Sequence, residues 1–252
     1  MRNCEYKRIV KGARRAFLFM HGIVGTPDHF VDIIDLVPED VTLWNIILDG
    51  HCGRVRDFAK TSMKKWEAQA AAVINELSET HDEIYVVAHS MGALLTINEA
   101  INNPKIVKMF FLQAAMVPCV KWGIVKTVLK IFFNDIKPDD PVMRASLRCY
   151  GIEIDRNLFG YIGWIPRFVE LFIKARRTVK LLDGFKTPSV AFMSKKDEVV
   201  AQSSTRILRS CPNIKVFDMH NSGHFYYDEN DVVALREEFA KFVSEEVEAD
   251  VG

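Results

Sequence analysis

The stretch Ile84-Tyr85-Val86-Val87-Ala88-His89-Ser90-Met91-Gly92 joins a continuous apolar run to the start of a helical pattern. Such a run is typical of a strand buried on both faces, and Asn103-Pro104 predicts the end of the helix that follows. Small residues stand two positions before and two positions after Ser90. This spacing in a strand–turn–helix setting is typical of a nucleophile elbow, where a strained turn lifts a serine hydroxyl above the sheet. We therefore predict that Ser90 is a nucleophile; the alternative is a serine that only begins a helix.

The same alternation of apolar runs and helical patterns extends over the chain. Alternating strands and helices imply parallel crossover connections and an α/β fold, with a mostly parallel central sheet flanked by helices. Strands are predicted at residues 16–20, 41–48, 84–88, 107–112, 189–193 and 214–217, and helices at residues 62–79, 91–101 and 231–243.

Residues 117–182 interrupt this alternation, because they show no clear strand and are rich in aromatic and aliphatic side chains. We predict a helical cap inserted into a core formed by residues 1–116 and 183–252. The insertion has two interpretations. It is either a set of ordinary core-facing helices or a lid whose apolar underside lines a substrate pocket.

Composition narrows the class of protein. The 252 residues carry 33 Lys and Arg against 33 Asp and Glu, and nucleic-acid binding, which needs a basic surface, is not expected. No apolar run of 18 residues or more suggests a membrane-spanning helix, and the N-terminal residues do not resemble a secretory signal. The five cysteines are too scattered for a disulfide framework or a zinc site. We expect a cytoplasmic protein without metal or cofactor.

A serine hydroxyl needs a base to remove its proton. His224 follows the last predicted strand in Asn221-Ser222-Gly223-His224-Phe225, at the carboxyl edge of the sheet where Ser90 also lies. His220 is the competitor, four residues earlier and without a preceding glycine to turn the loop inward. A metal pair formed by the two histidines would require a helix, which Ser222-Gly223 disfavours.

The base in turn needs a carboxylate to orient its ring and stabilise the imidazolium. Asp197 follows the penultimate predicted strand, at the same edge of the sheet. Glu198 and Asp218 are the weaker alternatives, and Asp218 lies within or at the end of the last strand. The order Ser, Asp, His along the chain favours Asp197.

The segment Met20-His21-Gly22-Ile23-Val24-Gly25-Thr26-Pro27 follows the first buried strand. Its glycines allow the backbone to approach the serine closely, so the N–H groups of Ile23 and Met91 are predicted to bind a tetrahedral oxyanion. The alternative is a glycine-rich turn with no ligand. The glycine spacing fits neither a dinucleotide-binding motif nor a P-loop.

These elements occur in the order found in α/β-hydrolases, which the chain resembles over most of its length. The segments 21–27 and Leu48-Asp49-Gly50-His51-Cys52-Gly53 resemble small bacterial carboxylesterases and monoacylglycerol lipases more narrowly. The resemblance implies an α/β-hydrolase fold with a helical cap over an acyl pocket, and the same catalytic and oxyanion residues. Three positions depart from the family pattern: Ala88 replaces a glycine, Ile23 an aromatic residue, and Cys52 interrupts Gly-His-Gly.

We predict a serine hydrolase that cleaves short- to medium-chain acyl esters, with monoacylglycerol as one case. Thioester cleavage, acyl transfer or carbon–carbon bond hydrolysis on the same residues, and a hydrolase-like small-molecule receptor, are the alternatives. The partner expected is a small-molecule ester in the apolar pocket. The basic, apolar segment 121–133 is interpreted either as a cap helix with solvated lysines or as a helix in weak contact with a lipid surface, without stable insertion. The sequence does not indicate an oligomeric state.

Overall fold

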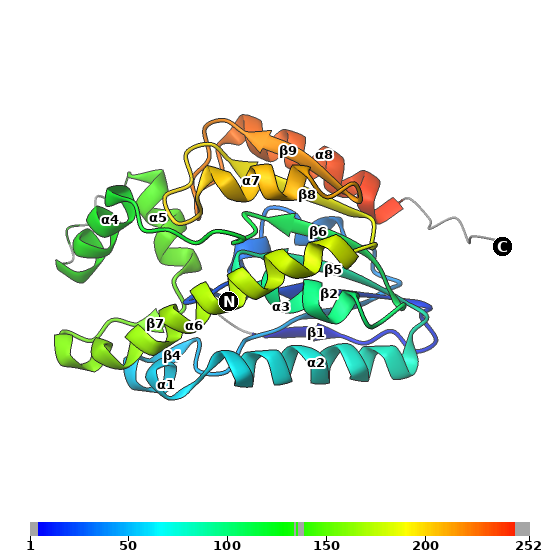
Figure 1. The fold of residues 1–252 in the computed structure, drawn as a ribbon, viewed down its shortest axis with the longest axis horizontal. Coiled ribbons are helices and arrows are strands. Elements are labelled where there is room, and N and C mark those ends of the chain that lie inside the picture. Colours follow the sequence, from blue (N-terminus) through cyan, green and yellow to red (C-terminus); the bar gives the residue numbers. More distant parts are fainter. Residues whose placement is uncertain (1–4, 134, 136–138, 245–252) are drawn as a thin grey trace.

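The computed structural model describes residues 5–133, 135 and 139–244. The ends of the predicted α/β core, residues 1–4 with Cys4 and residues 245–252, lie outside these ranges. Within them a seven-stranded sheet has the order β1-β3-β2-β5-β6-β8-β9 (Figure 1). Neighbouring strands are parallel except β1 and β3, which confirms the predicted mostly parallel sheet. The strands are β1 (Tyr6–Arg8), β2 (Arg15–Met20), β3 (Thr42–Asn45), β5 (Glu83–His89), β6 (Ile106–Leu112), β8 (Ser189–Ser194) and β9 (Ile214–Met219).

Two apolar layers enclose the sheet, because side chains of a strand alternate between its faces. In β2, Ala16, Leu18 and Met20 join one buried cluster, and Phe17 and Phe19 join the other. The first cluster is covered by α2 (Met63–Thr80), α3 (Met91–Ala100), α6 (Ile165–Leu181) and α7 (Gln202–Arg209). The second is covered by α8 (Glu229–Ser244) and the short 3₁₀ helices η1 (Pro27–Phe30) and η2 (Ile34–Leu36).

The helix α2 shows how the sequence determines such an element. Ser62 accepts a hydrogen bond from the backbone N–H of Lys65 at 3.2 Å and so caps the first turn. The apolar stripe that follows includes Trp66, Ala70 and Ile74, all fully buried against the sheet. The observed bounds differ by one residue at each end from the predicted range of 62–79.

The chain between β6 and β8 is mainly helical. It contains α4 (Trp122–Phe133), α5 (Pro141–Cys149), η3 (Leu158–Trp164) and α6, and Figure 1 shows α4 and α5 projecting to one side of the sheet. The expectation that this segment lacks a strand is wrong at one place. The two-residue strand β7 (Ile152–Glu153) pairs in parallel with β4 (Gly53–Arg54), and two residues are too few to show a periodicity.

The segment between β6 and β8 is also tied to the rest of the fold at other points. Trp164 donates a hydrogen bond from Nε1 to the carbonyl of Val55, the first residue of α1 (Val55–Lys60), at 2.9 Å. Farther along α6, Lys174 pairs with Glu67 of α2 at 2.8 Å. The second half of α6 therefore packs as part of the layer over the sheet. Among the described helices, none combines the length and hydrophobicity that a bilayer-spanning segment requires.

Gly92 permits the closest contact between a helix and the sheet. A Cβ atom on Gly92 would lie 2.2 Å from the carbonyl oxygen of Met20, at the end of β2. Backbone cannot move aside as a flexible side chain can, so overpacking here is expected to destabilise the fold.

We expect Gly92→Ala to lower the free energy of unfolding by about 1–3 kcal/mol or more, measured by urea denaturation. Gly184→Ala is the matched control, because nothing lies within 4 Å of its Cβ position. Equal urea midpoints for the two variants would contradict the argument.

Candidate active site

Ser90 lies in the turn between β5 and α3, in the conformation expected of a strained turn. Its φ is 53° and its ψ is −114°, an unfavourable region for a residue with a side chain. The turn packs against the loop that follows β2, since a Cβ on Gly22 would lie 2.7 Å from the Cβ of Ser90. Ser90 keeps only 2% of its surface exposed.

Three of the predicted residues meet at this point. His224 Nε2 lies 3.2 Å from Ser90 Oγ, and His224 Nδ1 lies 2.7 Å from Asp197 Oδ2. All three residues are almost completely buried, with exposed fractions of 1–2%. Residues from the ends of three strands thus form a continuous serine–histidine–aspartate chain of hydrogen-bonding groups.

The remaining oxygen of Asp197 explains how this carboxylate is fixed. Its Oδ1 accepts hydrogen bonds from the backbone N–H groups of Val199 and Val200, each at 2.7 Å. The other oxygen is directed at the ring of His224. A carboxylate held in this way can accept a hydrogen bond from the ring Nδ1–H of His224 without rotating.

The competing residues lie elsewhere. His220 is exposed, and its Nδ1 lies 3.3 Å from Lys195 Nζ rather than near the serine. Asp218 pairs with Arg209 at 2.7 Å and with Lys195 at 3.6 Å. Glu198 lies beside the site, but it accepts the backbone N–H of His224 at 3.1 Å and does not contact the ring.

Of the two predicted oxyanion donors, Met91 follows Ser90 directly, and Ile23 follows Gly22, which packs against Ser90. Met91 is the first residue of α3, and the N–H groups of a first helical turn have no partner within the helix. Within the described residues, the N–H of Ile23 has no hydrogen-bond acceptor. The carbonyl of Gly22, in the same peptide as that N–H, is bound by His21 Nδ1–H at 2.8 Å and by Gly25 N–H at 3.1 Å. Because a trans peptide points its C=O and N–H in opposite directions, these bonds also fix the direction of the Ile23 N–H.

The tautomer of His21 follows from its neighbours. The backbone N–H of Leu48 donates to His21 Nε2 at 3.1 Å, so Nε2 carries no proton and Nδ1 does. His51 packs edge-on against His21, with ring centroids 4.8 Å apart. The loop 48–53, which includes Cys52, therefore supports His21 and the glycine-rich loop through the Leu48 N–H and the ring of His51.

Sequence reasoning missed Gln113, which follows β6. Its Oε1 accepts the backbone N–H of Ser194 at 2.8 Å, and its Nε2 donates to the carbonyl of Gly223 at 3.1 Å. Gln113 thus joins the end of β8, which precedes Asp197, to the loop that carries His224. The sequence offered only a polar residue directly after an apolar run, and its complete burial is seen only in the structure.

Asp231, at the start of α8, was also missed. Its carboxylate accepts the backbone N–H groups of His220, Asn221 and Ser222 at 2.9–3.1 Å, and the hydroxyl of Ser222 at 2.7 Å. The loop before His224 is therefore anchored to the N-terminal turn of a helix.

Buried histidines surround the site. Burial lowers the pKa of His21 to about 4 and that of His29 to about 3. Burial likewise lowers the pKa of His51 and His89 well below the ordinary value. His89 Nε2 lies 3.2 Å from the carbonyl of His224, and its ring lies beside that of His29 at 4.1 Å. In the described part of the chain, no group of three or more His, Cys, Asp or Glu is arranged to hold a metal ion.

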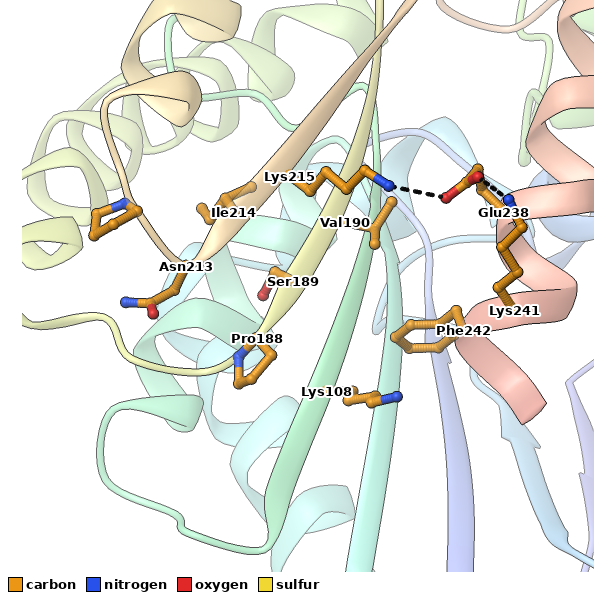
Figure 2. A pocket seen from close by; sticks show the side chains of 11 residues that line it. Lys108, Pro188, Ser189, Val190, Asn213, Ile214, Lys215, Glu238, Lys241 and Phe242 are labelled. Atoms are coloured by element: carbon orange, nitrogen blue, oxygen red, sulfur yellow. Dashed lines mark hydrogen bonds and ion pairs between the residues drawn. The ribbon is translucent and has the colours of Figure 1, made fainter. Parts of the chain in front are cut away.

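Two hollows described in the structure lie away from Ser90. The larger, of about 420 Å³, lies beside the first residues of β8 and β9, at the edge of the sheet opposite the serine (Figure 2). Figure 2 shows Glu238 between Lys215 and Lys241 on its rim, and ion pairs of 3.5 and 2.5 Å join them. The smaller hollow lies between α2 and α6. Neither is the apolar pocket predicted beneath the insertion.

A sequence model described as the alpha/beta hydrolase family matches residues 17–237, which include Ser90, Asp197 and His224. The chain belongs to the α/β-hydrolase family. A search of curated proteins finds no significant match.

Solved structures with the same fold include several lipolytic enzymes. One, from work on the metagenome-derived lipolytic enzymes LipS and LipT, has a TM-score of 0.71 and 17% identity over 95% of this chain and 98% of that one. A monoacylglycerol lipase from Paleococcus ferrophilus has a TM-score of 0.65 and 17% identity, covering 96% and 99% of the two chains. An enol-lactonase from Burkholderia xenovorans LB400 has a TM-score of 0.67 and 13% identity, covering 96% of each. At these identities the similarity shows the fold, and membership in this family supports a hydrolase activity.

The buried histidines predict an acid-labile hydrolase. Unfolded chains protonate histidine near its ordinary pKa of 6.5, whereas the native protein keeps these rings neutral. The unfolded state therefore binds more protons as the pH falls, and stability decreases. We expect the urea concentration at the unfolding midpoint to decrease as the pH is lowered from about 6.5 to about 5, a range in which most carboxyl groups are still ionised.

Two substitutions test whether the buried histidines cause this loss of stability at low pH. His21→Gln removes one buried ring that resists protonation, so it should make the decline shallower. His220→Gln changes an exposed ring and should leave the slope unchanged. A urea midpoint that is constant over this pH range would refute the explanation.

Proposed function

We propose that the protein is a serine hydrolase that cleaves carboxylic esters. The observation that carries the proposal is the arrangement of Ser90, His224 and Asp197, with contacts of 3.2 and 2.7 Å in the order that catalysis requires. The family and its lipolytic structural neighbours support a hydrolase, and the ester specificity is our inference from the site.

In the first half of the proposed reaction, His224 Nε2 accepts the proton of Ser90 as its Oγ attacks the ester carbonyl. Asp197 stabilises the imidazolium through Nδ1–H. The N–H groups of Ile23 and Met91 bind the oxyanion, and each such donor is typically worth about 3–4 kcal/mol of barrier. His224 then protonates the leaving alcohol, and an acyl-enzyme on Ser90 remains.

In the second half, a water molecule attacks the acyl-enzyme. His224 takes a proton from the water and returns one to Ser90 Oγ as the carboxylic acid leaves. The same two backbone N–H groups bind the second oxyanion. No further reactant is needed, so the cycle requires neither metal nor cofactor.

The segment 117–182 is proposed as the cap of the site. Lys121, just before α4, bonds through Nζ to the carbonyl of Asp197, and its N–H donates to the carbonyl of Glu198 at 3.0 Å. On the other side, Gly151 donates to Val24 of the glycine-rich loop at 2.9 Å. The insertion thus touches the loops on both sides of Ser90. Its apolar composition favours short- to medium-chain acyl esters, with monoacylglycerol as one case.

A lipid surface is the proposed partner of the cap. Most of the exposed large apolar side chains in the described ranges lie between residues 120 and 173. The helix α4 adds exposed Lys126 and Lys130 and has no acidic residue, so its charge favours an anionic surface. The apolar residues are Val120, Trp122, Val128, Leu129, Phe133, Val142, Ile154, Leu158, Phe159, Ile162, Ile165, Phe168, Val169, Phe172 and Ile173.

Cytoplasmic localisation remains a prediction. The free thiols of Cys119, Cys149 and Cys211 agree with a reducing compartment.

The proposed activity is tested with p-nitrophenyl esters of two to sixteen acyl carbons. We expect turnover by the native chain, and Ser90→Ala should lower kcat by about a million-fold, as removal of the nucleophile does in other triad hydrolases. Ser210→Ala, whose exposed hydroxyl lies at the end of α7, is the matched control and should retain full activity.

Two outcomes would overturn this proposal. Folded protein that hydrolyses no ester would favour a thioesterase, an acyltransferase, a carbon–carbon bond hydrolase or a small-molecule receptor. Activity that survives in Ser90→Ala would place the chemistry elsewhere. The acyl length with the highest kcat/KM measures the pocket beneath the cap.

The lipid contact is tested by sedimentation with vesicles of phosphatidylcholine, with and without phosphatidylserine. We expect binding only to the anionic vesicles, and Leu129→Glu should weaken it by adding charge to the apolar face of α4. Val233→Glu on α8 introduces the same charge at a similarly exposed position, 58% against 46%, and should bind like the native chain. Equal binding by the two variants, or none by the native protein, would dismiss the lipid surface.

A further inference from the structure

The glycine-rich loop 22–26 contains a strained residue next to the proposed oxyanion donor. Val24 has a φ of 51°, which is rare for any residue with a Cβ and a genuine outlier for a β-branched one. Such a conformation costs about 1–3 kcal/mol and persists only where surrounding contacts enforce it. The contacts that enforce it here are therefore part of what shapes the loop.

Those contacts come from the insertion, more than 120 residues away in sequence. The backbone N–H of Gly151 donates to the carbonyl of Val24 at 2.9 Å. The hydroxyl of Thr26 donates to the carbonyl of Arg148 at 3.4 Å. A Cβ on Gly151 would lie 2.3 Å from the carbonyl oxygen of Gly25, so only glycine permits this approach.

Gly151 is also held by the loop after β3. The N–H of Cys52 donates to the carbonyl of Gly151, and the β4–β7 pairing continues this contact through Gly53–Ile152 and Arg54–Glu153. The loop after β3, the insertion and the glycine-rich loop thus form one hydrogen-bonded layer. On the other side of Ser90, Lys121 of the insertion bonds to the loop of Asp197 and Glu198, while Gln113 and Asp231 position the loop of His224.

We propose that Gly151 is a positioning residue for the oxyanion site: the insertion holds loop 22–26 in the strained shape that presents the Ile23 N–H to the substrate. This proposal rests on the proposed function. If the carbonyl of Val24 is released, Val24 is free to return to negative φ, and the Ile23–Val24 backbone turns with it. His21 would still bind the carbonyl of Gly22, so the loss should be partial.

The test compares Gly151→Ala with Gly184→Ala, a glycine two residues beyond the insertion with nothing within 4 Å of its Cβ position. We expect Gly151→Ala to lower kcat about 10- to 100-fold, part of the 10²- to 10³-fold effect of losing one oxyanion donor. KM should change less than twofold, because the ground-state carbonyl binds this donor weakly. Affinity for a trifluoromethyl ketone with the preferred acyl chain should fall by the same factor as kcat. Gly184→Ala should change none of these.

Hydrogen exchange makes the inference independent of turnover. Amides of residues 21–26 should exchange faster in Gly151→Ala and at the native rate in Gly184→Ala. Unchanged exchange, or a kcat equal to that of the control, would overturn the positioning role, as would a rise in KM alone. Absence of turnover in the native chain would instead refute the proposed function, and the exchange measurement would still decide the role of Gly151. Should Gly151→Ala fail to fold, Thr26→Val removes the neighbouring contact with Arg148, and the same readouts apply.

Discussion

The tight packing of the β5–α3 turn against the end of β2 is the constraint on which the rest of the site depends. Gly92 lies against the carbonyl of Met20, and Gly22 lies against Ser90, so two backbones meet without side chains between them. This contact sets both the direction of the Ser90 side chain and the path of the loop that follows β2. This one packing interaction therefore fixes the nucleophile, the adjacent Met91 and the start of the loop that carries Ile23.

From this point the site extends along one edge of the sheet. Parallel strands have their carboxyl ends at the same edge of the sheet. The site is therefore formed at this edge by the loops that follow β2, β5, β6, β8 and β9. The strands bring residues near one another, but hydrogen bonds to backbone set the final geometry. Gln113 and Asp231 fix the loop of His224, and the N–H groups of Val199 and Val200 fix Asp197.

Much of the fold could be predicted from the sequence, because its strands are long apolar runs and its main helices carry regular apolar stripes. Ser90 carried a local signal in its small neighbours. The rule that parallel strands share an edge placed His224 and Asp197 near it, and the preceding Gly223 and the chain order Ser, Asp, His favoured them over His220 and Asp218. The structure brings these three side chains into contact and places His220 and Asp218 elsewhere.

The parts that could not be predicted depend on contacts between distant segments. The strand β7 has two residues, and its partner β4 lies about a hundred residues earlier, so neither has a periodicity to detect. The antiparallel strand β1 is only three residues long. Gln113 and Gly151 likewise have no motif of their own, because their significance lies in which backbone groups they reach.

The residues with positive φ have a consequence for the adaptation of this protein. Among the described residues other than glycine, they are Val24, Cys52, Ser90 and Gln113, and they follow β2, β3, β5 and β6 in turn. Strain of about 1–3 kcal/mol at each site is large beside the net stability of about 5–15 kcal/mol that is usual for folded proteins. Laboratory selection for heat resistance alone would therefore favour glycine or asparagine at these four positions. The selected variants would be more stable but would lose the rigid loops on which the proposed chemistry depends. Activity and thermal stability therefore have to be selected together.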